Sequence, residues 1–152
     1  MSAITEITEK PIGVHFDHAA CLLCGTDNPW SLGLTFESDS AGGVSTTVEA
    51  DARLQGYAGM LHGGVSAALL DAAMTHCLFH RGVRAVTADL RVRYVKSVPI
   101  RQGVTLKAWV TEEMPPLYRL KAQILLEGIV LVWAKATFCK LSANGTLDMA
   151  CS

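Results

Sequence analysis

An acid and a glycine pair stand at fixed spacing within one apolar stretch of the chain. Residues 62–81 read HGGVSAALLDAAMTHCLFHR, and apolar side chains on nearly every side predict a buried helix there. Asp71 lies in the middle of this helix, where an unpaired carboxylate among apolar neighbours is unfavourable and therefore rarely accidental. Such an acid could act as a general base toward water or as a nucleophile.

The start of the same helix could bind an oxyanion. His62 is followed by Gly63 and Gly64, and two glycines let a ligand approach backbone N–H groups that have no partner within the helix. The helix dipole favours negative charge at that end. For His62 we favour a structural cap that holds the glycine turn, because a histidine at the positive end of a helix is a poor base.

A sheet must position this helix. Alternating apolar residues predict strands over residues 32–37, 44–50, 87–95, 104–113, 118–127 and 129–141. Short turns join the last three strands, which predicts antiparallel neighbours. A sheet that curls around one helix explains why that helix has no solvent face.

The glycine pair, the acid nine positions after His62 and the strands downstream together resemble the hotdog-fold acyl-CoA thioesterases. The similarity covers about residues 32–141 and is strongest to the branch that includes the phenylacetic-acid-pathway enzymes. It implies an α+β hotdog fold, with an antiparallel sheet wrapped around one long central helix. It also implies hydrolysis of acyl-CoA to a carboxylic acid and CoA without a cofactor, by a homodimer or a dimer of dimers. We therefore divide the chain into a leader (1–31), a hotdog domain (32–141) and a tail (142–152).

The resemblance implies roles for individual residues. The backbone N–H of Gly63 or Gly64 would hold the thioester oxygen, and Asp71 would act as base or nucleophile. Gln55 would help to position the carbonyl or the water, although it lies seven residues before the histidine rather than the six of better-known members. Thr87 would touch the attacking water, but only if its strand begins or bends there, because strict alternation places it on the polar face.

The substrate residues are less specific. His62 lies close to the expected site, and a pocket for the acyl group would be lined by Tyr57, Met60, Leu61 and Met74. Arg91 and Arg93 are cations that could bind the phosphates of CoA. For any single one of these cations, a solvated strand face is the more common role. The acyl group itself cannot be read, and a small aromatic or a medium-chain acid fits.

A non-hydrolytic acyl-CoA-binding protein or a hydratase-type hotdog is the alternative. The hydratase branch places a histidine beside its acid, or a histidine and an acid on different chains. In this sequence His76 lies five residues after Asp71, nearly on the opposite face of the helix, which disfavours a dyad within one chain. The spacing also bears on assembly. Gly63 and Asp71 are separated by ~12 Å along the helix axis. A partner helix running antiparallel could bring its own acid to the glycine, which predicts a homodimer with shared sites.

Composition restricts the functional class. The chain has 152 residues and a formal net charge of -1, which argues for one domain and against nucleic-acid binding as the main role. No signal or transit segment is evident near the start. The most apolar stretch, residues 124–138, is interrupted by Glu127 and Lys135 and is too short to span a bilayer. We expect a cytoplasmic protein with no membrane contact.

Five cysteines at uneven spacing do not indicate a disulfide framework. His15, His18, Cys21 and Cys24 recur at every third position, and all four are good zinc ligands. However, such a C-x-x-C pair usually takes its other two ligands from a distant strand or helix, and the sequence offers none. We therefore favour a loop with buried thiols and exposed histidines, and expect no metal.

Overall fold

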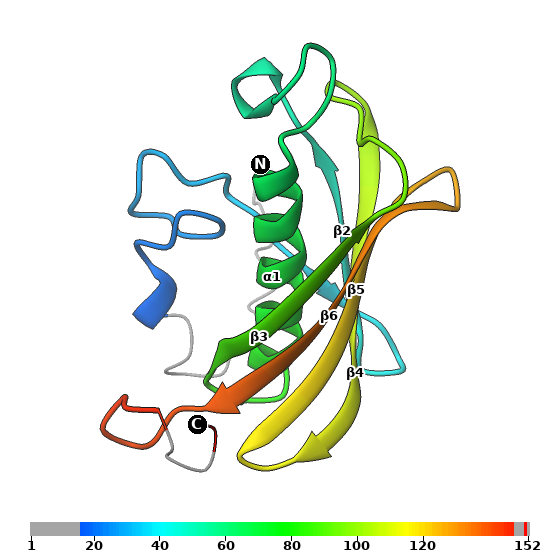
Figure 1. Cartoon of the computed structure of the whole chain (residues 1–152). Coiled ribbons are helices and arrows are strands. Elements are labelled where there is room, and N and C mark those ends of the chain that lie inside the picture. The colour runs from blue at the N-terminus through cyan, green and yellow to red at the C-terminus, as the bar shows by residue number, and fades with distance from the viewer. Residues whose placement is uncertain (1–15, 148–150, 152) are drawn as a thin grey trace, which may run out of the picture.

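The computed structural model describes residues 16–147 and Cys151. In chain order its elements are a 3-10 helix η1 (Phe16–His18), strands β1 (Glu37–Ser38) and β2 (Val44–Glu49), a 3-10 helix η2 (Ala52–Leu54), helix α1 (Gly63–Phe79) and strands β3 (Ala85–Tyr94), β4 (Gly103–Met114), β5 (Leu117–Leu126) and β6 (Ile129–Lys140). Figure 1 shows α1 with the sheet on one side and the blue leader segment on the other.

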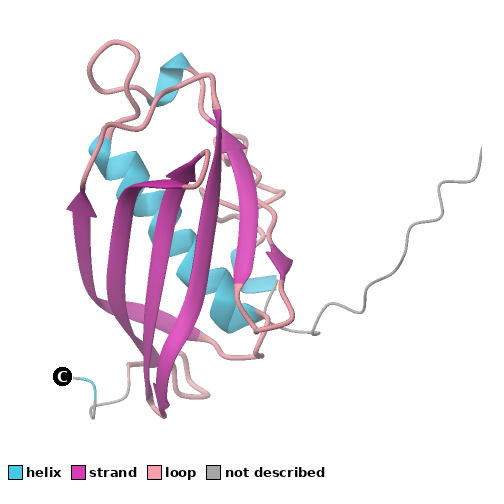
Figure 2. Ribbon diagram, turned by 90° about the vertical axis from the view of Figure 1, so that its right-hand side faces the viewer, coloured by secondary structure: helices cyan, strands magenta, loops and turns pink. Residues whose placement is uncertain are grey.

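The strands form one antiparallel sheet in the order β1-β2-β4-β5-β6-β3. The long strands curve around α1, which lies against their concave face (Figure 2). This is the α+β hotdog arrangement that the sequence predicts. The strand β3 ends the strand order and also packs against the helix.

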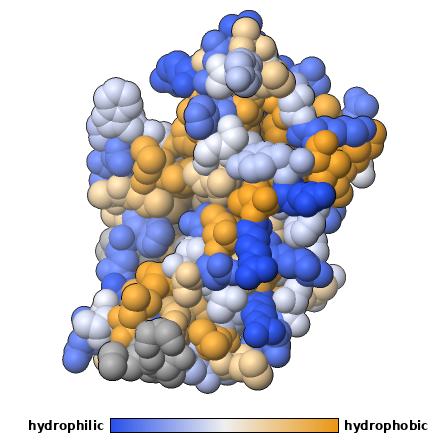
Figure 3. Space-filling view, in the orientation of Figure 1, coloured by the Kyte–Doolittle hydropathy of each residue, from blue (hydrophilic) through white to orange (hydrophobic). Residues whose placement is uncertain are grey.

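The core lies between helix and sheet. Leu70 and Met74 of α1 are fully buried, as are Ile124 of β5 and Phe138 of β6. Burial alternates along β4 and β5, as expected for strands with one face on a core. The outer surface is mixed, and hydrophilic residues lie beside hydrophobic ones on the face seen in Figure 3. Within the described residues, no helix is both long and apolar enough to cross a membrane.

The predicted strand over residues 32–37 is wrong for most of its length. Only Glu37 of that range lies in β1. The backbone N–H groups of Leu32 and Leu34 instead donate to the carbonyl oxygens of Leu22 and Leu23, each at 2.9 Å. The alternating pattern is present, but its hydrogen-bond partner is the leader loop rather than β2. The division into leader, domain and tail stays a prediction, and residues 1–15, 148–150 and 152 lie outside the described part of the chain.

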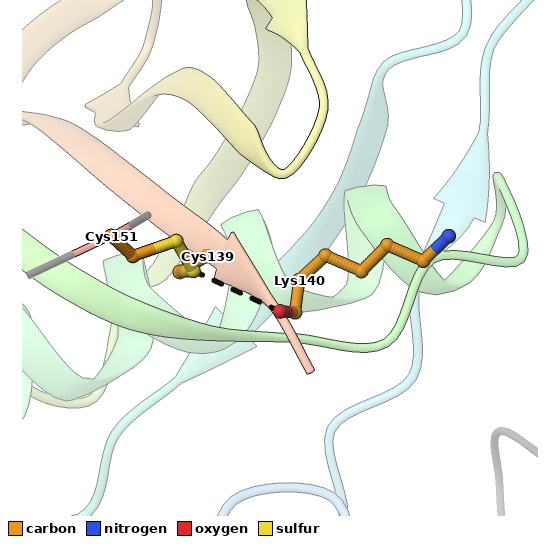
Figure 4. Close-up of a disulfide and its surroundings, with 3 residues drawn as sticks. All are labelled: Cys139, Lys140 and Cys151. Carbon is orange, nitrogen blue, oxygen red and sulfur yellow. Dashed lines mark hydrogen bonds between the residues drawn. A yellow bond between two sulfur atoms is a disulfide. The ribbon is translucent and has the colours of Figure 1, made fainter. Parts of the chain in front are cut away.

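One pair of cysteines is bonded, a pairing that the sequence analysis did not name. Cys139 of β6 forms a disulfide with Cys151, so the tail is tied back to the last strand (Figure 4). Cys21, Cys24 and Cys77 are free thiols. One disulfide is not a framework, but its formation depends on where the tail lies, and spacing alone does not show that.

Candidate active site

The acid in the middle of α1 has one specific partner. The hydroxyl of Thr87, on β3, donates a hydrogen bond to Asp71 Oδ1 at 2.5 Å. Asp71 is partly buried, and burial raises the pKa of its carboxyl, while the hydrogen bond from Thr87 acts in the opposite direction. The result is a carboxylate held in one orientation and made more basic than a solvated aspartate.

A bulge in β3 brings Thr87 to this position. Thr87 pairs with Phe138 of β6, but Asp89 pairs with Thr137, so the register shifts by one residue between them. An extra residue in one strand re-aims the side chains on either side of it. The sequence analysis required a bend at Thr87, and the structure has one. Ala88, which strict alternation would place on the core side, is exposed.

The glycine turn at the start of α1 is capped by His62. Its ring Nδ1 accepts a hydrogen bond from the N–H of Gly64 at 2.9 Å. The cap interpretation of His62 therefore agrees with the geometry, and the N–H of Gly64 is occupied. The N–H of Gly63 has no hydrogen-bond partner among the described residues. Of the two donors named from the sequence, only Gly63 presents its N–H to a ligand.

Tyr94, at the end of β3, completes this turn, and the sequence analysis did not assign it to the site. Its hydroxyl donates to the carbonyl oxygen of Gly63 at 2.6 Å. Its ring lies 3.5 Å from where a Cβ on Gly63 would stand. Thr87 and Tyr94 therefore hold the helix from the same strand at the two points where chemistry was predicted. In the sequence, Tyr94 is the last residue on the core-facing side of this strand, and that position was the signal that could have identified it.

Two cavities meet at the glycine turn. One, of about 230 Å³, is lined by Gly63, Ser66, Tyr94 and the segment that follows Tyr94. The other, of about 380 Å³, is lined by Tyr57, Met60 and His62 together with Gly63. Ligand pockets usually measure roughly 300–1,000 Å³. The first cavity is smaller than this range, and the second lies at its lower end. Neither cavity is lined by Asp71 or Thr87.

The remaining predicted residues lie elsewhere. Gln55 is exposed, and its side-chain oxygen accepts from the N–H of Gly59 at 3.2 Å, so it holds its own loop. Met74 is 0% exposed and belongs to the core, so it does not line the pocket predicted from the sequence. Arg91 forms an ion pair with Asp89 on the exposed side of β3, and Arg93 is exposed two residues further on.

Comparisons with known proteins show which family and fold this chain resembles. Residues 58–113 match the family model of the thioesterase superfamily. A solved thioesterase superfamily protein is 30% identical, with a TM-score of 0.71, over 75% of this chain and 60% of that protein. This chain therefore spans less than two thirds of the length of that relative.

Two further structures share the fold. A hypothetical thioesterase with coenzyme A from Streptococcus pneumoniae is 21% identical, with a TM-score of 0.66 over 71% of this chain and 85% of its own. A mutant of the phenylacetic acid degradation protein PaaI from Thermus thermophilus is also 21% identical, with a TM-score of 0.64 over 70% and 92%. No curated protein matches the chain.

Proposed function

We propose that this chain, a member of the thioesterase superfamily with the hotdog fold, hydrolyses acyl-CoA thioesters to a carboxylic acid and CoA. The observation that carries the proposal is the hydrogen-bonded pair of Asp71 and Thr87 in the middle of α1. A partly buried carboxylate with raised pKa suits a group that takes a proton from water. The unpaired N–H of Gly63 supplies the second requirement, a donor for the developing oxyanion.

Two routes use the same groups. In the first, Asp71 accepts a proton from water as the water oxygen attacks the thioester carbonyl. Gly63 N–H holds the oxyanion, the C–S bond breaks, and the CoA thiolate takes the proton from Asp71 and leaves as the thiol. In the second, the Asp71 carboxylate attacks the carbonyl itself, the C–S bond breaks and CoA is released as the thiolate. Water then hydrolyses the mixed anhydride and supplies the proton that makes CoA the thiol. A single turnover in ¹⁸O-labelled water distinguishes the two routes if, in the second route, water attacks the aspartyl carbon of the anhydride. The first route then labels the product acid, and the second labels Asp71.

One chain does not bring both groups to one place. Asp71 lies eight residues after Gly63 on α1, or ~12 Å along the axis, and neither cavity at the glycine turn includes the acid. A base must come within ~3 Å of its proton, directly or through one water. We infer that a second copy, with its helix antiparallel to the first, supplies the acid to each glycine turn. Because β3 ends the strand order, a second copy can approach α1 along this strand.

Acyl-CoA is the substrate class that the comparisons favour, since one structural neighbour carries coenzyme A. Arg91 and Arg93 stay candidates for binding the CoA phosphates. They do not line the cavities of their own chain, so in this proposal they would reach the CoA bound by the partner subunit. Lys96 lines the cavity beside Gly63 and is a further cation at the turn. The phenylacetic-acid-pathway-like branch, the acyl group, a dimer of dimers and a cytoplasmic location stay predictions.

The hydratase alternative loses support from the surroundings of His76. Its ring stacks on Phe36 at 4.6 Å and meets Phe79 edge-on at 5.2 Å. This histidine is 7% exposed and packed among aromatic rings at the far end of the helix. The described side-chain partner of Asp71 is Thr87.

The kinetic test is substitution of the acid. Purified protein is assayed by thiol release on a panel of aryl- and fatty-acyl-CoA esters, and Asp71→Asn is expected to lower kcat by at least ~10²-fold on the best ester. Asp27→Asn is the matched control, because Asp27 is exposed in the leader and its carboxylate accepts a hydrogen bond from the Thr26 hydroxyl, away from the helix start. Near-wild-type turnover by Asp71→Asn contradicts the catalytic assignment. Binding of CoA esters with no turnover by the wild type favours the acyl-CoA-binding alternative.

The shared site is tested by mixing variants. A chain carrying Asp71→Asn and a chain carrying Gly63→Val are each expected to be inactive, whereas their heterodimer regains one of two sites. The control is a heterodimer of the wild type with a chain carrying both substitutions. If sites are shared, both of its sites are broken and it is inactive, but if each chain works alone it keeps half the activity.

A further inference from the structure

The leader loop carries a cluster of metal-binding side chains that the proposed reaction does not use. The donor atoms of His18, Cys21 and Cys24 all lie within 4.8 Å of one another, and all three side chains are partly buried. They come from η1 and the turn that follows it, at the end of α1 remote from the glycine turn. We propose that this His18–Cys21–Cys24 cluster binds a divalent transition metal, zinc foremost.

The spacing of the donor atoms suits a tetrahedral ion. Zinc lies about 2.3 Å from thiolate sulfur and about 2.0–2.1 Å from imidazole nitrogen, so two such ligands on one ion stand roughly 3.5–3.8 Å apart. Cys24 Sγ lies 3.7 Å from His18 Nδ1. Cys21 lies close enough to Cys24 to interact with its thiol. Closure onto an ion therefore needs only small movements of side chains.

The backbone is already folded around the cluster. The N–H of Gly25 donates to the carbonyl of Cys21 at 2.8 Å, and the N–H of Cys21 donates to the carbonyl of His18 at 3.0 Å. A Cβ on Gly25 would stand 2.5 Å from the Ala19 oxygen and from the Cys21 nitrogen, so no larger residue fits. The N–H of Leu23 points at Cys21 Sγ at 3.4 Å, a contact that stabilises a thiolate.

Without a cation the cluster is electrostatically unfavourable for thiolates. Burial, followed by the neighbouring Cys21, raises the pKa of the Cys24 thiol to about 12. A bound dication reverses this preference, because thiolate is the ligand form and its proton is released on binding.

The fold changes the argument made from sequence. The sequence analysis expected no metal, because it found no distant second pair of ligands, but η1 turns His18 onto the cysteine pair. Among the described residues the cluster has three ligands, which leaves one tetrahedral position on the ion. His15, the other member of the predicted set, lies outside the described residues. The His18 ring meets Phe79 edge-on at 4.6 Å, and Asp17 pairs with Arg84 at 2.7 Å. A metal at this cluster would therefore hold the leader against the C-terminal end of α1, remote from the glycine turn.

The test is a cobalt titration of the untagged full chain, stripped with a chelator and kept reduced. We expect one Co²⁺ per chain, with thiolate-to-cobalt absorption that Zn²⁺ removes. Cys21→Ser, Cys24→Ser and His18→Ala should lose stoichiometric uptake. Cys77→Ser and His80→Ala are matched controls outside the cluster and should bind as the wild type does.

A second measurement needs no variant. Zn²⁺ should raise the Tm of the wild type and protect Cys21 and Cys24, but not Cys139 or Cys151, from alkylation followed by mass spectrometry. The proposal is overturned if reduced wild type takes up no Co²⁺ or Zn²⁺ at micromolar concentrations. It is equally overturned if the Cys21→Ser/Cys24→Ser chain binds as well, or if the two thiols only form a disulfide in air.

Discussion

Helix α1 is capped at its start by His62 and carries His76 in its last turn, and these two histidines have opposite surroundings. His62 at the start is exposed, and its ring caps the glycine turn. His76 in the last turn is 7% exposed and packs against Phe36 and Phe79. The leader contacts the end of the helix, where the His18 ring meets Phe79 edge-on at 4.6 Å, and it runs along one side of α1 in Figure 1.

The two ends of the helix therefore have different roles: the start, which we call the open end, faces the cavities, and the last turn, which we call the closed end, packs in the core. At the open end, two cavities meet beside a backbone donor that has no partner among the described residues, which is the condition for binding a ligand. At the closed end, apolar and aromatic side chains are removed from water, which stabilises the fold. Substitutions at the two ends should therefore affect different measurements.

The largest expected effect is on stability, at the closed end. Phe79 is 3% exposed, and Phe79→Ala should lower the free energy of unfolding by about 3–5 kcal/mol. Tyr57→Ala at the open end is the control, because Tyr57 is 84% exposed and should change stability by less than about 0.5 kcal/mol. Urea unfolding followed by circular dichroism measures both. Equal losses in the two variants would remove the distinction between the ends.

At the open end the main effect should be on turnover. Gly63→Val is expected to lower kcat/KM by about 10²-fold, because the added side chain blocks approach to the N–H that holds the oxyanion. Within one chain there is room for a Cβ at position 63, because its nearest contact would be the Tyr94 ring at 3.5 Å. Valine is also a better helix former than glycine, so stability should not fall. A variant that loses stability and activity together contradicts this assignment.

The cap should give a smaller effect. His62→Ala removes the acceptor for the Gly64 N–H and should cost about 1 kcal/mol of stability, while His62→Asn, which keeps an acceptor, should cost less. KM for the best ester separates the two roles of this residue. An unchanged KM supports a cap alone, and a raised KM in both variants shows that the ring also contacts substrate.

The smallest change is expected in the pH profile. The hydrogen bond from Thr87 lowers the pKa of Asp71, against the larger rise caused by burial. Thr87→Val removes that bond, so the Asp71 pKa rises further and the base is lost at a higher pH. The acid limb of the kcat/KM profile should therefore move upward, and Thr87→Ser should restore it. A flat profile from pH 5 to 8 in the wild type would count against Asp71 as the titrating base.

Much of the fold is readable from local pattern. Residues 62–81 are predicted as a helix and α1 occupies Gly63–Phe79, while the last three strands lie within two residues of their predicted bounds. These elements depend on periodicities and turns that lie within them. The segment 32–37 shows the limit, because an alternating pattern predicts an extended chain but does not name its hydrogen-bond partner.

The site divides in the same way. The sequence alone determined which groups are available, Asp71 and the glycine pair, and how far apart they stand, because the rise of a helix sets that distance. Tertiary structure decided which of them are usable. A one-residue register shift between β3 and β6 turns Thr87 to the acid, and the ring of His62 occupies one of the two glycine donors.

The same reason accounts for the residues that were misplaced or missed. Met74 reads as a pocket residue by its type and place in the helix, but the sheet closes over it. The sequence shows the spacing of Cys21 and Cys24, and only the fold of the leader brings His18 beside them. Composition and spacing determine what a side chain can do, while the packing of segments distant in sequence decides which partner it meets.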